Sequence, residues 1–238
     1  EFGMETGVTA VGVAPSGRIW LLGQLLADGT GWWIFQLLDT GGNPTDNRAL
    51  TFPGYGFETT IPTAMVIQPD GDVLLGGWGR TGSPDYFASM AVARILGSTL
   101  NLDPTFGGSG TGELVITDFA PAYLRSIALQ PDRSIVVAGE YGLLNEENIV
   151  VTRLSPDGTL AGAFTEYVAF DIGGSGGDGG GGMNRMVVQS DGKIVVAAAA
   201  ITGDTGNVID VGVARVLAES GLDSSFGGLG TGKRTFDM

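Results

Sequence analysis

The sequence contains no cysteine and no histidine, and only 12 of its 238 residues are Lys or Arg, against 26 Asp and Glu. Without cysteine or histidine the chain has no disulfides, thiolate nucleophile, Ser-His-Asp triad, or zinc site built on nitrogen or sulfur. The net charge of −14 argues against nucleic acid and anionic membranes as partners, because both bind basic surfaces. A cation or a basic partner suits this composition better.

Long hydrophobic runs are also missing. Apolar runs such as 194–201 stop far short of the roughly 20 residues that a membrane helix needs, so we expect no membrane insertion. Hydrophobic residues still make up 43% of the chain, which excludes a disordered protein. The first residues show no signal-peptide pattern. Because Glu1-Phe2-Gly3 precede Met4, we interpret residues 1–7 as an expression remnant or linker and 8–238 as one domain.

What the sequence does contain is a repeated hairpin, seen in the segment Ile127–Glu140. Two runs rich in Val, Ile and Leu flank a Pro-Asp turn, which is a hairpin signal because Pro presets φ and Asp bonds its own backbone. Related copies occur at Val13–Ile19, Ile67–Val73 and Val188–Ile194. In these copies Ser-Gly or Asp-Gly supplies a residue that tolerates positive φ.

The spacing of the copies indicates a repeat architecture. Pro15, Pro69, Pro131 and Ser190 are separated by roughly 54, 62 and 59 residues, which is enough for four strands and their turns. We therefore predict an all-β propeller of four antiparallel four-stranded blades, with repeats at about 8–60, 61–120, 121–182 and 183–238. The alternative is a larger ring, completed by a second chain in a homodimer or by further repeats.

The first repeat is the divergent one. We expect strands at 8–14, 18–24 and 32–38 and a fourth near 49–57. Trp20, Trp32 and Trp33 gather in this repeat. Such aromatics can stack on a sugar, but aromatics in strands more often pack in a core, and we interpret them as packing residues.

Three third strands carry an arginine within an apolar run: Arg94, Arg153 and Arg215. A charge among apolar neighbours has to be paired. Asp103 and Asp223, each in a Leu-Asp-x-x-Phe-Gly-Gly segment, are the expected partners. Since the pattern recurs from repeat to repeat, we interpret it as scaffold rather than as a catalytic site.

These hairpins, Ala-Arg strands and Leu-Asp-x-x-Phe-Gly-Gly segments resemble the delta-60 repeat β-propeller family of bacterial proteins. The resemblance extends over nearly the whole chain and is most specific in the second and fourth repeats. It implies a propeller fold and a secreted or surface-attached bacterial protein. The resemblance implies no general set of catalytic residues for this chain.

Two sets of loops would lie on opposite faces of such a propeller. The short Pro-Asp-Gly turns lie on one face, and the variable loops 25–31, 79–86, 141–148, 173–182 and 202–210 lie on the other. Variable loops on a repeated scaffold usually carry function. We predict a non-catalytic recognition or structural module that binds a protein or glycan partner through this face, with ordinary solvated loops as the alternative. The candidate ligand-binding residues are Trp78, Arg80, Asp85, Tyr86, Tyr141, Glu146, Glu147, Asp204 and Asp210.

Two further hypotheses about function depend on carboxylate side chains. A carbohydrate-active hydrolase or lyase needs a spaced carboxylate pair, for which Glu140, Glu146 and Glu147 are candidates; the alternative is that these residues decorate a solvated loop. Asp178, within the glycine run 173–182, matches the start of a calcium-binding nonapeptide. A flexible loop is the competing interpretation, and we expect no other cofactor.

Overall fold

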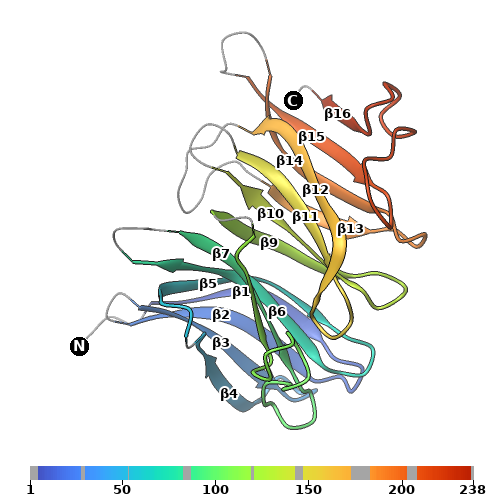
Figure 1. Cartoon of the computed structure of the whole chain (residues 1–238). Coiled ribbons are helices and arrows are strands. Elements are labelled where there is room, and N and C mark those ends of the chain that lie inside the picture. Colours follow the sequence, from blue (N-terminus) through green and yellow to red (C-terminus); the bar gives the residue numbers. More distant parts are fainter. Residues whose placement is uncertain are drawn as a thin grey trace. The chain divides into compact units, whose positions relative to one another are not determined.

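The computed structural model describes residues 5–27, 30–52, 54–82, 87–118, 121–142, 147–172, 183–202 and 208–236. Throughout these ranges the regular elements are β-strands, sixteen in number (Figure 1). The prediction of an all-β chain is therefore confirmed. No helix in the described ranges is long and apolar enough to cross a membrane.

The chain forms two compact units: Glu1–Ile127 with Asp157–Thr159, and Ala128–Pro156 with Leu160–Met238. The first unit holds β1 (Glu5–Val13), β2 (Ile19–Ala27), β3 (Thr30–Leu38), β4 (Pro44–Leu50), β5 (Phe57–Ile67), β6 (Val73–Thr81), β7 (Ala88–Ile95) and β8 (Glu113–Ile116). Strand β9 (Ala122–Leu129) runs from the first unit into the second. The second unit continues with β10 (Ile135–Tyr141), β11 (Glu147–Leu154), β12 (Leu160–Ile172), β13 (Met183–Val188), β14 (Ile194–Thr202), β15 (Val208–Val216) and β16 (Lys233–Phe236).

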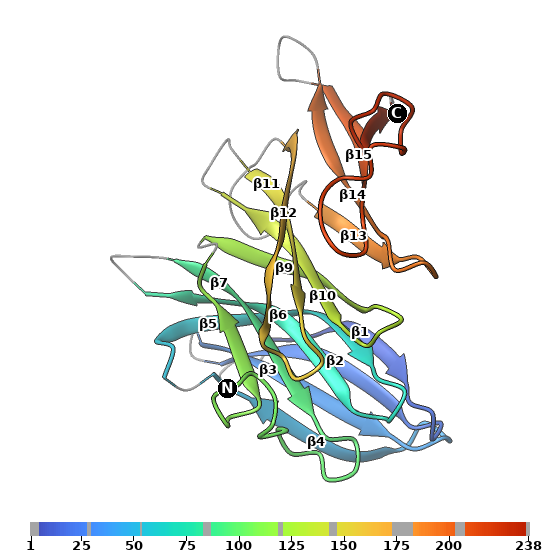
Figure 2. The ribbon, with the colours of Figure 1, turned by 45° about the vertical axis from the view of Figure 1, so that its right-hand side comes forward.

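Neighbouring strands in the sequence pair antiparallel in four successive groups of four (Figures 1 and 2). The groups do not form four separate sheets, as predicted, but sheets of eight, four and four strands. The eight-stranded sheet arises because a single parallel pairing, Gly31 with Thr59, joins β3 to β5. The periodicity of the sequence predicts strands but not isolated bridges between them. The sequence therefore did not predict that β3 and β5 are joined.

The fourth strand of the first repeat lies earlier than predicted. It spans Pro44–Leu50, whereas we expected 49–57. The cause is a tight turn after β3, in which the backbone N–H groups of Gly41 and Asn43 both donate to Asp39 Oδ1 at 2.8 Å. This turn returns the chain at once into β4 and leaves residues 51–56 as a connection.

The hairpin turns have the backbone that their residues indicate. Gly17, Gly71 and Gly192 adopt φ values of 82°, 94° and 83°, which glycine tolerates without a steric cost. The third repeat has Arg133 at this point, with φ of 70°. A side chain in left-handed backbone is disfavoured, so this turn stores local strain.

Each unit has its own core. In the first unit Trp20 and Trp33 are 1% and 0% exposed and pack with residues of β6 and β7 such as Leu75 and Ala93. Their interpretation as packing residues is confirmed. Trp32, between them on the opposite face of β3, is 36% exposed, because successive side chains of a strand alternate between faces. The second core is built from Val, Ile and Ala residues of β10, β11, β12, β14 and β15 together with Met186 of β13.

The arginine and aspartate pairs form as predicted in the second and fourth repeats. Arg94 Nε lies 2.7 Å from Asp103 Oδ2, and Arg215 Nε lies 2.9 Å from Asp223 Oδ2. Both aspartates are 6% exposed. These pairs close each loop against its third strand, which supports the interpretation as scaffold.

In the third repeat the arginine of the third strand pairs with a different carboxylate. Its Leu-Asp segment is missing, and Arg153 Nη2 instead pairs with Asp132 and donates to Ser134 Oγ at 2.8 Å. Both partners belong to the Pro-Asp-Arg-Ser turn between β9 and β10. The half-buried Arg153 therefore pairs with a carboxylate in the first hairpin of its own repeat, in place of the missing Leu-Asp segment.

Candidate functional site

A cavity of about 350 Å³ opens in the first unit between the first residues of β3, the connection from β4 to β5 and the first residues of β5. We call it the aromatic cavity; its lining residues are Gly31, Trp32, Thr51, Phe52, Gly54, Gly56, Phe57 and Thr60. The β4–β5 connection lies at the strand ends opposite the Pro15-Ser16-Gly17 turn. In this unit a cavity thus lies at the strand ends where the variable loops were predicted to carry function.

The cavity owes its shape to close backbone contact between β3 and β5. Thr60 Oγ1 donates to the Gly31 carbonyl at 2.7 Å, and Gln24 Nε2 donates to the Thr60 carbonyl at 3.3 Å. A Cβ on Gly31 would lie 2.7 Å from the Thr60 carbonyl oxygen, too close for any side chain. Gly31 is therefore required for the parallel bridge that forms one wall.

Aromatic rings supply much of the remaining wall. Trp32 is 36% exposed, while the half-buried Phe57 stacks on Tyr55 with ring centroids 6.0 Å apart. Phe52 is 5% exposed and meets the buried Trp33 edge to face at 4.6 Å. The lining combines apolar ring surface, two threonines and glycine backbone. It contains no ionisable side chain among the described residues, so it offers apolar contact and hydrogen bonding but no acid or base.

Three predicted ligand-binding residues have described side chains. Trp78 is 2% exposed and packs edge to face against Tyr123 at 5.0 Å, so its ring is taken up by packing within the first unit. Arg80 lies half-buried at the end of β6. Tyr141 lies half-buried at the end of β10, in the second unit, with its ring 5.2 Å from that of Tyr167.

The other predicted residues are less fully described. Glu147 begins β11 and Asp210 lies in β15, and only their backbone is described. Asp85, Tyr86, Glu146 and Asp204 lie outside the described residues, as does Asp178 with the whole run 173–182. Their roles stay predictions. Within the described ranges, no three Asp or Glu side chains gather in a way that could hold a metal ion.

Glu140 does not lie in a solvated loop. It is 6% exposed within β10, opposite Ile149 of β11. The interpretation that it decorates the loop surface is wrong for this residue, because Glu140 lies inside β10 and pairs with β11 in the sheet.

A buried carboxylate that the motifs did not flag is Glu113, in β8. It is 2% exposed, and its Oε1 atom has no hydrogen-bond partner among the described residues. Burial raises the pKa of Glu113 to about 7. Asp223 shows the opposite effect, because the hydrogen bond from the Ser225 hydroxyl, followed by the Ser225 N–H and Arg215, lowers the pKa of Asp223 to about 2.

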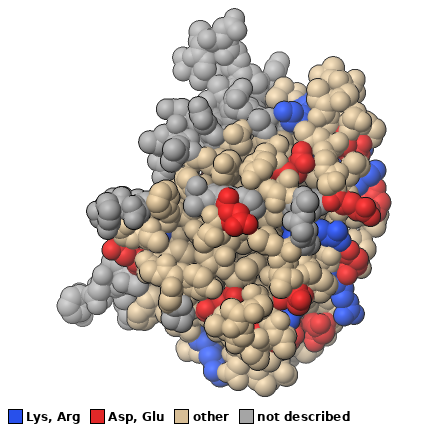
Figure 3. All heavy atoms as spheres, viewed as in Figure 1, with Lys and Arg blue, Asp and Glu red and all other residues tan. Residues whose placement is uncertain are grey.

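Charged side chains are dispersed on the described part of the face shown in Figure 3. On the face shown in Figure 3, Asp and Glu side chains lie scattered among uncharged residues and near Lys and Arg. That face shows no single acidic patch, so the net charge of −14 alone does not locate a binding site there.

The sequence did not predict the aromatic cavity, although it drew attention to Trp32. Trp32 stood out in the sequence, yet it was grouped with Trp20 and Trp33 as a packing residue. The alternation of side chains along β3 could have separated it, because adjacent Trp32 and Trp33 must face opposite sides of the sheet. Phe57 and Thr60 carried no such signal, since they approach Trp32 only through the bridge between β3 and β5.

Comparison with known proteins supports the propeller assignment. The family model described as a β-propeller domain of unknown function, DUF5122, matches residues 130–160 and 189–226. The match supports a β-propeller repeat family. No curated protein matches the sequence.

Solved structures resemble the chain at low sequence identity. Levansucrase from Bacillus subtilis is 10% identical, with 98% of this chain and 73% of that chain covered, at a TM-score of 0.55. A levansucrase variant from B. megaterium is also 10% identical, with coverage of 98% and 72% and a TM-score of 0.50. A protein of unknown function from Dyadobacter fermentans is 9% identical, covering 99% and 84%, at 0.38. At this identity the two levansucrases support the fold alone.

Proposed function

We propose that this protein is a non-catalytic recognition module that binds a glycan in the aromatic cavity. The observation that carries the proposal is the exposed ring of Trp32 in a cavity that also presents Thr51 and Thr60. Ligand sites are commonly concave and largely apolar, with a few polar groups that fix orientation. The aromatic cavity has this composition.

A sugar ring suits such a lining. One face of a pyranose presents C–H groups that pack on an aromatic ring, while its edge presents hydroxyls. Tryptophan supplies a large apolar surface for the first contact. The Thr51 hydroxyl and the backbone around Gly54 and Gly56 can exchange hydrogen bonds with the sugar hydroxyls, and the Thr60 hydroxyl, which donates to Gly31, can accept one.

Binding is favoured over hydrolysis at this cavity. Glycoside hydrolysis normally needs two carboxyl groups about 5 to 10 Å apart. The described lining of the aromatic cavity contains none. A hydrolase or lyase would have to use carboxylates elsewhere, such as Glu146 and Glu147.

We further propose that the four strand groups are the blades of a four-bladed propeller with the first strand of each innermost, and that the protein is secreted or displayed on a bacterial surface. In this arrangement the other predicted loop residues, including Arg80 and Tyr141, would act as contacts for a glycan or an accompanying protein. Light scattering in solution tests ring closure: a monomer supports four blades in one chain, and a homodimer supports the larger shared ring.

A glycan array followed by calorimetric titration tests the binding proposal. Trp32→Ala is expected to weaken binding of the identified glycan about tenfold, which corresponds to the loss of about 1.4 kcal/mol of contact with the ring. Phe236→Ala, a matched loss of an exposed aromatic in the second unit, is the control and should bind normally. Absence of any glycan hit, or a hit whose affinity is the same in the Trp32→Ala variant, would overturn the proposal.

A further inference from the structure

The first and second repeats pack on each other through the first strands of their hairpins. In β5, Met65 and Ile67 hold the places that Val11 and Val13 hold in β1, on either side of Gly12. A Cβ added to Gly12 would lie 2.8 Å from Ile67 Cδ1 and 3.2 Å from Met65 Cε. Both side chains also pack against the core of the first unit. The second repeat therefore covers the Gly12 side of the first repeat.

The fourth repeat packs on the third in the same way. Met186 and Val188 of β13 hold the places of the two covering residues of β5. Met186 is 6% exposed, and Val188 packs against the same second core. Ala128 of β9, at the place of Gly12, packs against this core too. In both units the two residues before the hairpin turn of the later repeat thus cover one side of the earlier repeat.

The opposite side of the first repeat has no such cover among the described residues of its unit. Val11 and Val13 are 66% and 65% exposed, although the residues at their places in β5 and β13 pack in a core. Val11 pairs with Leu21 of β2, and Leu21 lines a second cavity, of about 250 Å³, together with Val8 and Ile34. We call these five residues the first-repeat face. None of the five lines the aromatic cavity.

The fourth repeat is uncovered on the side that points away from the second core, as far as the described part of its unit shows. Val187, at the place of Ala128 in the third repeat, is 59% exposed. It pairs with Val195 of β14, which is half-buried, as are Val211 and Val213 of β15. We call these four valines the fourth-repeat face.

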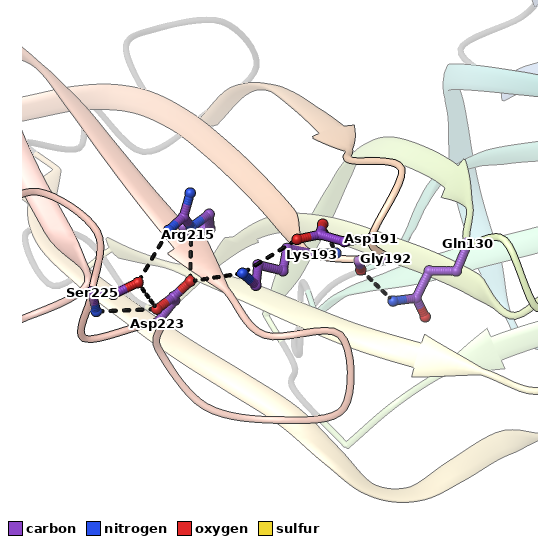
Figure 4. Close-up of polar contacts among 7 residues, drawn as sticks. All are labelled: Gln130, Asp191, Gly192, Lys193, Arg215, Asp223 and Ser225. Carbon is purple, nitrogen blue, oxygen red and sulfur yellow. Dashed lines mark hydrogen bonds and ion pairs between the residues drawn. The ribbon is translucent and has the colours of Figure 1, made fainter.

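The third repeat shows the same side in its covered form. The residues at the places of the last three of these valines are 0% exposed in the second core: Val136, Ile149 and Val151. Arg215, which pairs with Val195, leaves no free charge at the fourth-repeat face, because its Nε donates to Asp223 Oδ2 at 2.9 Å (Figure 4). The fourth-repeat face therefore has the apolar composition of a covered face without the cover.

The two faces are complementary halves of the contact that joins repeats elsewhere in the chain. The first-repeat face supplies the two residues before the turn, and the fourth-repeat face supplies the side of the sheet that such residues cover. A repeat that cannot bury its faces alone is stabilised by stacking on a neighbour, and exposed apolar patches mark interaction sites. We propose that the first-repeat face packs on the fourth-repeat face and closes the ring. The inference rests on the four-bladed propeller proposed above and identifies Val11, Val13 and Val187 as its closing contact.

Cross-linking of paired cysteines tests this contact, because the natural chain contains no cysteine. By analogy with Met65 and Gly12, Val11→Cys and Val187→Cys in one chain should bring two thiols close together. A short bismaleimide at low protein concentration is expected to link them within the chain, which intact mass and a denaturing gel detect. Val11→Cys with Leu160→Cys is the matched control. Leu160 is 38% exposed but begins the outer strand of the third repeat, so this pair should not link.

The same experiment names the results that would overturn the proposal. A link between two chains would mean that a second copy covers the first-repeat face. Absence of a link in Val11→Cys with Val187→Cys, or an equal yield in the control pair, would mean that the two faces do not meet. A monomer without the link leaves the ring of four to close through other residues, so this inference can fail while that proposal stands.

Substitutions at the first-repeat face give a second test that needs no cross-link. Val11→Ser combined with Val13→Ser should lower the melting temperature, because the closing contact loses two buried apolar side chains. Leu229→Ser, at a residue that is 77% exposed and outside both faces, should leave it unchanged. An unchanged melting temperature in the double valine variant contradicts the contact. Glycan binding that still depends on Trp32 in these variants keeps the glycan proposal separate from this one.

Discussion

Glu113→Gln should make the first unit more stable at alkaline pH and leave it nearly unchanged in acid. The Glu113 carboxyl is 2% exposed, and burial raises its pKa from 4.5 to about 7. The native state therefore keeps a proton that the unfolded chain releases above pH 4.5. Because the native state binds more protons in this range, the free energy of unfolding falls as pH rises from about 4.5 to about 7.

The size of the effect follows from the two pKa values. At about 1.4 kcal/mol for each pH unit between them, the upper bound is about 3 kcal/mol, and local relaxation around the ionised carboxylate reduces it to about 1–3 kcal/mol. Glutamine has nearly the same shape and no charged form. The Glu113→Gln variant should therefore exceed the natural chain in stability by about 1–3 kcal/mol at pH 8, and by little at pH 4.5.

Urea unfolding at several pH values between 4.5 and 8 measures this difference. All four tryptophans, at positions 20, 32, 33 and 78, belong to the same unit as Glu113, so tryptophan fluorescence follows the correct unit. Glu58→Gln removes an exposed carboxylate of that unit and serves as the control. Parallel stability curves for the natural chain and Glu113→Gln across this range would refute the reasoning.

Three further predictions concern the turns, the ion pairs and calcium. Arg133→Gly should raise the free energy of unfolding by about 1 kcal/mol, because φ at this residue is 70° and left-handed backbone disfavours a side chain; an unchanged or lower melting temperature would contradict this. Asp223→Asn should lower stability at neutral pH and flatten its decline in acid. The Ser225 and Arg215 contacts lower the pKa of Asp223 to about 2, so their stabilisation is present above pH 3.8 and lost as pH falls toward 2; acid unfolding curves that coincide for both chains would refute it. If Asp178 binds calcium, millimolar calcium should raise the melting temperature relative to chelator, and Asp178→Asn should remove the increase; equal melting temperatures would exclude the site.

The sequence by itself determined the features that depend on local order along the chain. The alternation of apolar residues predicted most strands, and the Pro-Asp-Gly turns predicted the hairpins, because both signals act within a few residues. The pairing of Arg94 with Asp103 could be foreseen as well. A buried guanidinium needs a carboxylate, and the repeat places one nine residues away.

Only the tertiary structure decided which residues form the two cavities. Trp78 looked like a surface aromatic but packs against Tyr123, 45 positions later by residue number. Strand alternation places Trp32 and Trp33 on opposite faces, but it does not say which of the two faces lies in the core. Gln130 meets Gly192 and Ala218 across separations of 62 and 88 residues. Contacts over such distances depend on how separate hairpins pack, and a repeat pattern describes each hairpin without specifying the side-chain contacts between them.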